Sequence, residues 1–253
     1  MQLTILGAGS SAGTPAVGCP CVTCVSTDHR NKRTRCSSMV TLDDGRVILI
    51  DTSPDLRQQA LRENMQRVDA VLFTHTHADH LHGIDDLRAF CQINRCQIPL
   101  YSYPEAISHI QDKFGYTLRE PSNFWDLPVL AAHVVETPFE VAGQAVTPIP
   151  VMHGKIRIYA YRIRNLVYMT DVSSIPESSY ELLRDVDLLL IDCLRETPHP
   201  THVSLSESLA LISRIGAKRN VLIHMTHELE YHALQATLPA NVEVGYDGLQ
   251  LTI

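Results

Sequence analysis

The sequence predicts an α/β protein in which two strand-rich regions form a sheet-on-sheet core with helices outside it. Three observations lead to this prediction. Apolar segments short enough for strands recur along the chain, predicted helices separate many of them, and no linker or internal repeat divides the 253 residues. A chain of this length can bury one large core, so we expect a single domain spanning residues 1–253.

The first half of the chain begins with a strand and a hairpin. Leu3–Leu6 is apolar and runs into a loop of small residues, and the turn residues 43–46 separate two further apolar segments. Ser53 before Pro54 is a typical helix start. The expected strands lie near residues 3–6, 38–42, 47–50 and 68–74, and the expected helices start at Pro54 and lie near 83–94 and 104–114.

The second half of the chain alternates strands with helices. Leu188–Ile191 is a continuous apolar run, which is typical of a strand that is buried on both faces. The expected strands lie near residues 129–135, 144–151, 156–163, 166–170, 188–191, 221–224, 242–245 and 249–252, and the expected helices near 176–184, 204–215 and 228–238. Helices would then cover the outer faces of both sheets.

The composition is that of an ordinary globular protein. Apolar residues make up 45% and charged residues 19%, which excludes general disorder. No apolar run approaches the roughly 18 residues that a membrane span needs. The net charge of −7 argues against broad binding to nucleic acid or to an anionic membrane. Residues 1–7 lack the basic region and cleavage site of a signal peptide, so we expect a cytoplasmic protein.

Histidine is the most informative residue type, because it is the commonest metal-ligating side chain and 13 are present. The segment HTHADH supplies His75, His77, Asp79 and His80 within six positions. It follows a predicted strand, so we expect it on the loop at the strand's end. There His75 and His77 can converge on one ion, and Asp79 and His80 point to a second ion beside it. The alternative is a polar loop with coincidental histidines.

Other ligands of a dinuclear site should come from other strand ends. His153, Asp171 and His224 each come directly after a predicted apolar strand. Taken alone, each is more typical of a structural polar group, but the HTHADH segment favours the metal site for all three. We assign His75, His77 and His153 to one ion, Asp79, His80 and His224 to the other, and Asp171 to both.

Asp51 is a candidate for orienting one of these ligands. It follows the predicted strand Val47–Ile50. A metal-bound histidine usually donates its second ring N–H to a carboxylate or a carbonyl group. We therefore predict that Asp51 accepts such a hydrogen bond; the alternative is an ordinary helix cap.

The ligand pattern resembles that of the metallo-β-lactamase superfamily, whose signature is HxHxDH followed by a distant His, Asp and His. The resemblance covers essentially the whole chain. It implies a four-layer αββα sandwich with a dinuclear metal site at one edge, which is consistent with the expected order of strands and helices. The ligand assignment above agrees with the family pattern at each position.

A cysteine segment narrows the resemblance. Cys19, Cys21 and Cys24 supply three thiolates, and this spacing in a chain without an export signal favours metal over disulfides. A tetrahedral site would need a fourth ligand, and His227 is permitted by its place in the sequence. Resemblance to PhnP-type phosphodiesterases implies a structural zinc held by a cysteine loop at about residues 15–36 and this histidine. Three reduced, buried cysteines are the alternative.

The same resemblance implies a function. His202 precedes a predicted helix and is not needed as a ligand; in the phosphodiesterase branch a histidine at the matching place lies beside the metals, which makes His202 the candidate general acid. With Asp79 it forms the predicted catalytic set. The implied activity is hydrolysis of a small phosphodiester, including cyclic ones, with two manganese or zinc ions at the active site and one structural zinc. A homodimer is implied by resemblance alone.

Three alternatives stay open on the sequence. The ligand set is also similar to that of tRNA 3′-processing endonucleases, although the gripping arm of those enzymes and a basic stripe are not evident here. The same ligands serve ester and thioester hydrolases. A non-enzyme similar to the cofactor-biosynthesis protein PqqB would share the cysteine site but depart from the catalytic ligands.

The cysteines Cys36, Cys91, Cys96 and Cys193 are expected to be free, mostly buried thiols.

Overall fold

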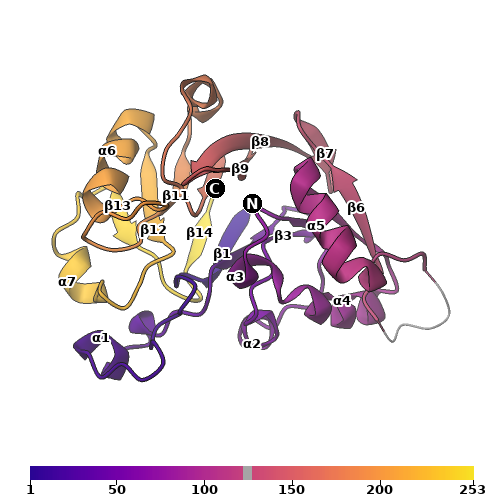
Figure 1. Ribbon diagram of the computed structural model, residues 1–253, viewed down its shortest axis with the longest axis horizontal. Helices are drawn as coiled ribbons and strands as arrows, with labels where there is room; N and C mark the ends of the chain where they lie inside the picture. Colours follow the sequence, from indigo (N-terminus) through magenta and orange to yellow (C-terminus); the bar gives the residue numbers. More distant parts are fainter. Residues whose placement is uncertain (122–126) are drawn as a thin grey trace.

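Two mixed sheets lie face to face in this computed structural model, which describes residues 1–121 and 127–253 (Figure 1). The first sheet contains, in order, β14 (Gln250–Thr252), β1 (Gln2–Gly7), β2 (Ser37–Thr41), β3 (Val47–Ile50), β4 (Ala70–Leu72), β5 (Ile98–Ser102) and β6 (Leu130–Val134). The second contains β13 (Val242–Val244), β12 (Arg219–Ile223), β11 (Leu188–Asp192), β10 (Leu166–Met169), β9 (Ile156–Ile163), β8 (Gln144–His153) and β7 (Phe139–Val141).

Helices cover the outer faces of both sheets, which confirms the predicted αββα sandwich. In Figure 1, α4 and α5 lie beside the first sheet on one flank, and α6 and α7 lie beside the second sheet on the other. The helices are α1 (Val22–Val25), α2 (Leu56–Arg62), α3 (Ala78–Leu81), α4 (Leu87–Asn94), α5 (Pro104–Phe114), α6 (Leu205–Ile215) and α7 (Tyr231–Gln235). The 3₁₀ helices are η1 (His29–Asn31), η2 (Ile84–Asp86), η3 (Gly115–Thr117) and η4 (Glu177–Leu183).

The alternation of side chains along β3 accounts for the layered core. Ile48 and Ile50 belong to the cluster between the sheets, whereas Leu49 belongs to a second cluster beneath α2, α4 and α5. Successive side chains of a strand point to opposite faces, so a strand buried on both faces reads as an unbroken apolar run. The run of four apolar residues in β3 is the sequence signature of this position in the middle of the sandwich.

The direction of the strands brings the predicted site residues to one edge. β3 and β4 are parallel, and so are β10, β11 and β12. β8 runs in the same direction as β10, because β9 is antiparallel to both. Parallel strands end at the same edge of a sheet, which is where α/β proteins place their binding sites. The residues at or directly after these carboxyl ends include Asp51, His75, His153, Asp171, Asp192 and His224.

Several elements differ from the sequence predictions for local reasons. β5 is not among the predicted strands, because it is short and contains Pro99, a residue that argues against a central strand. The helix expected from Pro54 is confined to α2, since Asn64 adopts a left-handed conformation (φ 50°) just beyond it. The helix expected near 228–238 shortens to α7 because the Glu230 side chain caps it at its start. The helix expected near 176–184 is the 3₁₀ helix η4.

In the part of the chain that the structure describes, no helix is long and apolar enough to cross a membrane.

Candidate metal centre

The HTHADH segment begins at the carboxyl end of β4 and is tied to the second sheet. The backbone N–H of Tyr159 donates a hydrogen bond to the Thr74 carbonyl oxygen (3.1 Å), and the Tyr161 hydroxyl donates to the Phe73 carbonyl oxygen (2.9 Å). Tyr161 is fully buried. These bonds cross from one sheet to the other, so they fix the start of the segment relative to ligands from the second sheet.

The segment is partly helical. His77 is the N-cap residue of α3, and Asp79 and His80 lie inside this single turn. The prediction of a loop for all six residues is therefore wrong for the last three, because the spacing of ligands cannot distinguish a loop from one helical turn. The turn aims Asp79 and His80 at the ends of the second sheet's strands, while His77 stays exposed at the mouth of the site.

One group of ligand atoms consists of Asp79, His80, His224 and one oxygen of Asp171. Nε2 of His80 lies 3.4 Å from Asp79 Oδ2 and 3.1 Å from Asp171 Oδ2. Nε2 of His224 lies 3.5 Å and 3.4 Å from the same two oxygens. Two ligand atoms bound at about 2.1 Å and at a tetrahedral angle are about 3.4 Å apart. These separations therefore fit four ligands of one ion.

A second group lies beside the first. The ligand atoms of His75, His77, His153 and Asp171 lie within 4.8 Å of one another. Oδ1 of Asp171 is 3.8 Å from Nε2 of His75, whereas Oδ2 faces His80 and His224. The two oxygens of one carboxylate thus face two different groups, which is the geometry required of a bridging ligand. The structure brings together all seven residues that the sequence assigned to the dinuclear site.

Unsatisfied buried atoms support a cation at this position. Nε2 of His75, of His80 and of His224 is buried and makes no hydrogen bond of proper geometry among the described residues, although each faces an Asp171 oxygen at 3.1–3.8 Å. Such orphaned atoms are uncommon in native proteins and call for an explanation such as an ion. All three belong to the two ligand groups, so the residues present fit a pair of metal ions.

The electrostatics of the centre also favour cations. Burial acts to raise the pKa of Asp171, but the neighbouring His224 and His80 hold it well below its usual range. Burial acts to lower the pKa of His224, but the Asp171 carboxylate raises it to about 9. The carboxylates therefore draw positive charge into a buried cluster, and divalent ions can supply that charge in place of protons.

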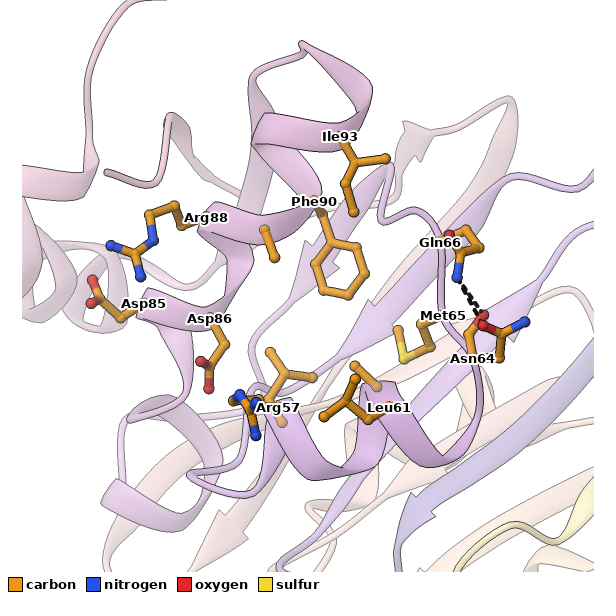
Figure 2. A pocket seen from close by; sticks show the side chains of 13 residues that line it. Arg57, Leu61, Asn64, Met65, Gln66, Asp85, Asp86, Arg88, Phe90 and Ile93 are labelled. Atoms are coloured by element: carbon orange, nitrogen blue, oxygen red, sulfur yellow. Dashed lines mark hydrogen bonds between the residues drawn. The ribbon is translucent and has the colours of Figure 1, made fainter. Parts of the chain in front are cut away.

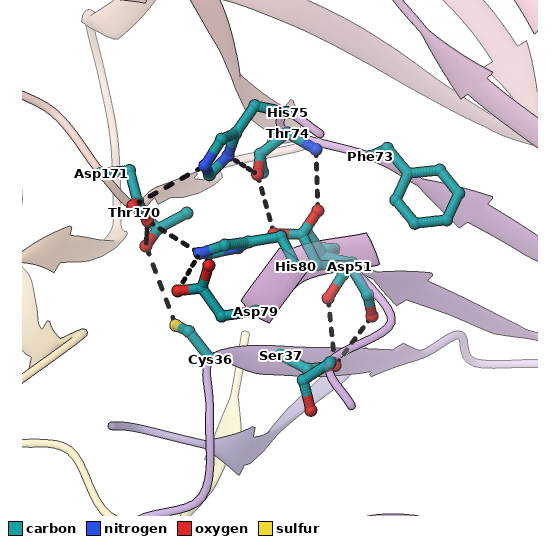
Figure 3. A network of polar contacts seen from close by, with 12 residues as sticks. Cys36, Ser37, Asp51, Phe73, Thr74, His75, Asp79, His80, Thr170 and Asp171 are labelled. Atoms are coloured by element: carbon teal, nitrogen blue, oxygen red, sulfur yellow. Dashed lines mark hydrogen bonds and ion pairs between the residues drawn. The ribbon is translucent and has the colours of Figure 1, made fainter. Parts of the chain in front are cut away.

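Asp51 orients His80, as the sequence predicted for one ligand (Figure 3). Its Oδ2 accepts a hydrogen bond from Nδ1 of His80 (2.8 Å), which directs Nε2 toward Asp79 and Asp171. Thr74 holds the carboxylate in turn, donating its backbone N–H to Oδ1 and its hydroxyl to Oδ2, both at 2.8 Å. Asp51 is fully buried and is not a helix cap, because α2 begins only at Leu56.

Three site residues adopt a left-handed backbone conformation. The φ angles are 61° for Asp51, 55° for Asp171 and 58° for His224. A positive φ is uncommon for residues other than glycine and costs free energy, so it persists where the surroundings enforce it. Each of the three stands one or two residues after a strand, where the reversal of the chain turns the side chain toward the shared site.

His202 lies next to both ligand groups. Its ring stacks on that of His224 (centroids 4.9 Å apart, 11° between planes) and lies 4.7 Å from that of His153. Nε2 is 3.9 Å from Asp171 Oδ1, and Nδ1 is 2.8 Å from Asp192 Oδ2. Burial lowers the pKa of His202 to about 4, and burial raises that of Asp192 well above its ordinary value. The hydrogen bond from Nδ1 to Asp192 fixes the orientation of the His202 ring.

Sequence reasoning missed Asp192. It ends β11, the apolar run identified as a buried strand, and it stands there in the same way as Asp171 follows β10. That parallel was a usable signal. A second contact was also missed: the carbonyl oxygen of Thr201 accepts a hydrogen bond from Nδ1 of His153 (2.8 Å). Every residue has a backbone carbonyl group, so the sequence carries no signal for this contact.

The cysteine segment forms a separate cluster with His227. Sγ of Cys19 and Sγ of Cys21 lie 3.5 Å and 3.3 Å from Nδ1 of His227, and Cys24 completes the group. Zinc bound to sulfur at about 2.3 Å and to nitrogen at about 2.1 Å would hold these atoms about 3.6 Å apart. The interaction with His227 lowers the pKa of the Cys21 thiol to about 6. The donor set therefore fits a zinc ion, and thiolate is available to bind it at neutral pH.

Two cavities differ in their relation to the centre. A cavity of about 310 Å³ is lined by Thr76, which stands between two predicted ligands, and by residues of α5 and β9. An apolar pocket of about 390 Å³ between α2 and α4 contains Met65 and Phe90 but none of the predicted ligands (Figure 2). Neither cavity is lined by a predicted ligand, but the first includes the chain neighbour of His75 and His77.

Comparison with known proteins places this geometry among relatives. Residues 46–225 match the beta-lactamase superfamily domain. The crystal structure of a diphosphatase from the PhnP family is 39% identical in sequence, with a TM-score of 0.92; the match covers all of this chain and 97% of that one. Zinc-bound PqqB from Methylobacterium extorquens has a TM-score of 0.81 with full coverage of both chains, but at 22% identity it is evidence of the fold alone.

A further relative is longer than this chain. An octanoyltransferase from Porphyromonas gingivalis is 38% identical over 257 residues, which cover all of this chain. They cover 52% of the relative, so the chain spans about half of that protein's length.

Proposed function

The chain belongs to the beta-lactamase superfamily, and on this premise we propose that it is a metal-dependent phosphodiesterase that hydrolyses small phosphodiesters, including cyclic ones. The fold implies a hydrolase that binds divalent metal. The observation that carries the finer proposal is the pair of adjacent ligand groups joined by the two oxygens of Asp171, with His202 beside both.

In this proposal three ions are bound by each chain. His75, His77 and His153 would hold one, Asp79, His80 and His224 would hold the second, and the two oxygens of Asp171 would serve one each. Mixed imidazole and carboxylate ligands accept manganese or zinc, and three thiolates with one imidazole select zinc. When bound, two ions at the central site would lower the pKa of a water molecule and neutralise charge on a phosphoryl group.

The chain's own residues then supply orientation and a proton. His202 would hold a proton on Nε2, on the side that faces Asp171, and give it to the departing alkoxide. Asp192 fixes the ring by accepting from Nδ1 at 2.8 Å. An anionic phosphoryl group beside Nε2 would favour the protonated imidazole, which offsets the lowering of the His202 pKa by burial.

The surroundings of the site support a small substrate. The cavity of about 310 Å³ beside Thr76 can take one substituent of the phosphodiester. The net charge of −7 disfavours a long polyanion such as tRNA.

The test is turnover of bis-p-nitrophenyl phosphate and of a 2′,3′-cyclic nucleotide by protein saturated with manganese, with metal counted on each sample. We expect hydrolysis of both substrates, three ions per chain in the wild type, and loss of turnover in Asp79→Asn with the cysteine-site zinc retained. A fully metallated wild type that hydrolyses neither substrate would refute the phosphodiesterase proposal.

A second candidate is hydrolysis of an acyl ester or thioester. The observation that favours it is the similarity of the whole chain to about half of a protein named for octanoyl transfer. Octanoyl thioester and p-nitrophenyl octanoate therefore belong in the same assay. Turnover of these acyl substrates, together with no turnover of the phosphodiesters, would replace the first proposal with the second.

The two remaining alternatives are addressed by the same samples. Specific cleavage of a precursor tRNA would favour the endonuclease. A PqqB-like metal-binding protein would hold one zinc per chain under metal-replete conditions and no ions at the central site. All seven predicted ligand positions of that site are filled by ligand-type residues, which argues against this reading.

A further inference from the structure

One short segment serves both predicted metal sites. His224 follows β12 and faces the central site, and three residues later His227 faces the cysteines. His224 also holds a left-handed conformation (φ 58°). Because so few bonds separate the two ligands, a shift of the chain at His227 is transmitted to His224 unless other contacts absorb it.

A buried arginine clamps the chain next to this segment. Arg33 is 1% exposed, and its Nη2 donates hydrogen bonds to the carbonyl oxygens of Thr226 (3.2 Å) and Leu229 (2.6 Å). Nη1 lies 3.6 Å from Sδ of Met225. These contacts hold the backbone on both sides of His227.

Arg33 is unusual in having no acidic partner at contact distance. It forms no ion pair with any residue in the described part of the chain, and its Nε has no hydrogen-bond partner there. Burial lowers the pKa of its guanidinium to about 10. Burying an unpaired charge costs several kcal/mol, so an apolar residue would be favoured if filling space were the only requirement. The geometry indicates that an arginine is needed at this position to donate hydrogen bonds to the two carbonyl groups.

Further contacts from the cysteine loop fasten the same chain region. The side chain of Asn31 donates to Glu230 Oε1 (2.6 Å) and accepts from the backbone N–H of Tyr231 (2.9 Å). The backbone of Arg33 pairs with that of Thr14 through two 2.8 Å hydrogen bonds. Figure 1 shows α1 and its loop next to α7, so these contacts join the cysteine loop to the C-terminal part of the chain.

The other side of the segment is fixed by β1 and the residues after it. The backbone N–H of Met225 donates to the Ala8 carbonyl (3.0 Å), and that of Ser10 donates to the Met225 carbonyl (3.1 Å). Held from both sides, the segment has little freedom to relax. The cysteine loop is therefore mechanically connected to His224.

We propose that Arg33 is a positioning residue for His224, and that zinc at the cysteine site, acting through the same segment, sets the metal affinity of the central site. The proposal rests on the metal sites of the proposed function, but it concerns binding and not turnover. It assigns to the cysteine site a regulatory role in place of a purely structural one: loss of zinc there would release His227 and weaken the central site.

The test measures manganese affinity at the central site without substrate, by calorimetry and by the loss of the free-ion electron paramagnetic resonance signal. Arg33→Met should raise the Kd at least tenfold while zinc content stays at one per chain. His227→Ala, which removes the zinc, should raise the Kd by a similar factor. Arg33→Lys, which can still reach one carbonyl group, should fall between Arg33→Met and the wild type.

Arg46→Met is the matched control. Arg46 carries the same charge as Arg33, but it pairs with Asp44 in the exposed turn and donates to no residue of the 225–229 segment. Its Kd should stay within twofold of the wild type. Free energies of unfolding are measured for all variants, because a Kd that rises in proportion to lost stability in Arg46→Met as well would indicate general destabilisation and not positioning.

The combination of Arg33→Met with His227→Ala decides whether both act through one segment. If they do, the double variant should bind manganese about as weakly as the weaker single variant. Additive losses, or an unchanged Kd in zinc-free His227→Ala, would overturn the proposal. If Arg33→Met does not fold, the Kd values of His227→Ala and Arg33→Lys test the same proposal. A wild type that binds manganese tightly but hydrolyses no phosphodiester would refute the proposed function and leave this inference testable.

Discussion

At the scale of single residues, two of the ligand histidines are held by hydrogen bonds that leave their other ring nitrogen facing the site. Nδ1 of His80 is held by Asp51, and Nδ1 of His153 by the Thr201 carbonyl. A fixed Nδ1–H leaves the Nε2 lone pair available, which selects the tautomer that can bind a metal. The partners are thus as much part of the site as the ligands.

Asp51→Asn should weaken metal binding at the central site by 10- to 100-fold, the range typical for loss of a hydrogen-bond partner behind a ligand. Asparagine tolerates the left-handed conformation at position 51, so the backbone should be preserved. Its amide, however, has a single neutral acceptor oxygen, where the carboxylate accepts from Thr74 and His80 on two oxygens. Calorimetric titration with manganese measures the effect, and Asp44→Asn in the exposed turn serves as the control. An unchanged Kd in Asp51→Asn would contradict the orienting role.

His202→Asn should slow hydrolysis to an extent that depends on whether the leaving group needs a proton. Loss of a general acid typically costs about 10²- to 10⁴-fold, but p-nitrophenolate departs without a proton. We therefore expect a large loss of kcat for the cyclic nucleotide and a much smaller loss for bis-p-nitrophenyl phosphate, with metal content unchanged. Equal losses for both substrates would mean that His202 acts on binding or on the metals instead.

The ligand residues were predictable from the sequence, but much of their support was not. His75, His77, Asp79 and His80 are close in the chain, so their type and spacing reveal them. Thr201 contributes a carbonyl oxygen, which any residue could supply. Arg33 reads in the sequence as one of several basic residues, and only its burial and its contacts with residues 225–229 distinguish it.

At the scale of elements, α6 sets the position of the loop that carries His202. The helix starts with a capping box, in which the Ser204 hydroxyl donates to Glu207 Oε2 (2.6 Å) and the Ser204 backbone N–H donates to the same oxygen (2.8 Å). Gly216, with a φ of 74°, ends the helix in the left-handed conformation that suits glycine. Both ends of α6 are thus fixed by local chemistry.

Ser204→Ala should lower the free energy of unfolding by about 1 kcal/mol at pH 7. The hydrogen bonds from Ser204 lower the pKa of Glu207 below its ordinary value of 4.5. A carboxyl group with a lowered folded-state pKa stabilises the fold above its unfolded pKa, and this stability is lost as the pH falls through the folded-state value. The difference between variant and wild type should therefore shrink below pH 4.5. Urea unfolding of metal-free protein at several pH values checks this; a difference independent of pH would contradict it.

Most elements followed from apolar periodicity, and those that did not share a physical reason. β5 carries Pro99 inside a central sheet, where pairing with β4 and β6 on both sides outweighs local propensity. The turn of α3 is too short for a helical pattern to be visible. In both cases the structure is set by contacts between distant parts of the chain, which a local pattern cannot contain.

At the scale of the whole molecule, the centre lies where the two sheets meet. The first sheet and the helix that follows β4 contribute Asp51 and the HTHADH ligands, and the second sheet contributes His153, Asp171 and His224. Ions bound there connect the two layers of the sandwich. Without them, the buried carboxylates would face one another with only protonated histidines to balance their charge.

Removal of metal should therefore lower the stability of the whole fold. A ligand that binds only the folded state stabilises it by about 2.7 kcal/mol at a concentration of 100 times its Kd. We expect the Tm to fall on treatment with a chelator and to rise steadily as manganese is restored, since each increase in concentration adds binding free energy to the folded state. Asp79→Asn is the control: with one ligand of the central site altered, its Tm should respond much less to manganese than that of the wild type. A wild-type Tm that is indifferent to both treatments would mean that the two layers are held together by the apolar core alone, and that the ions contribute chemistry without contributing to the fold.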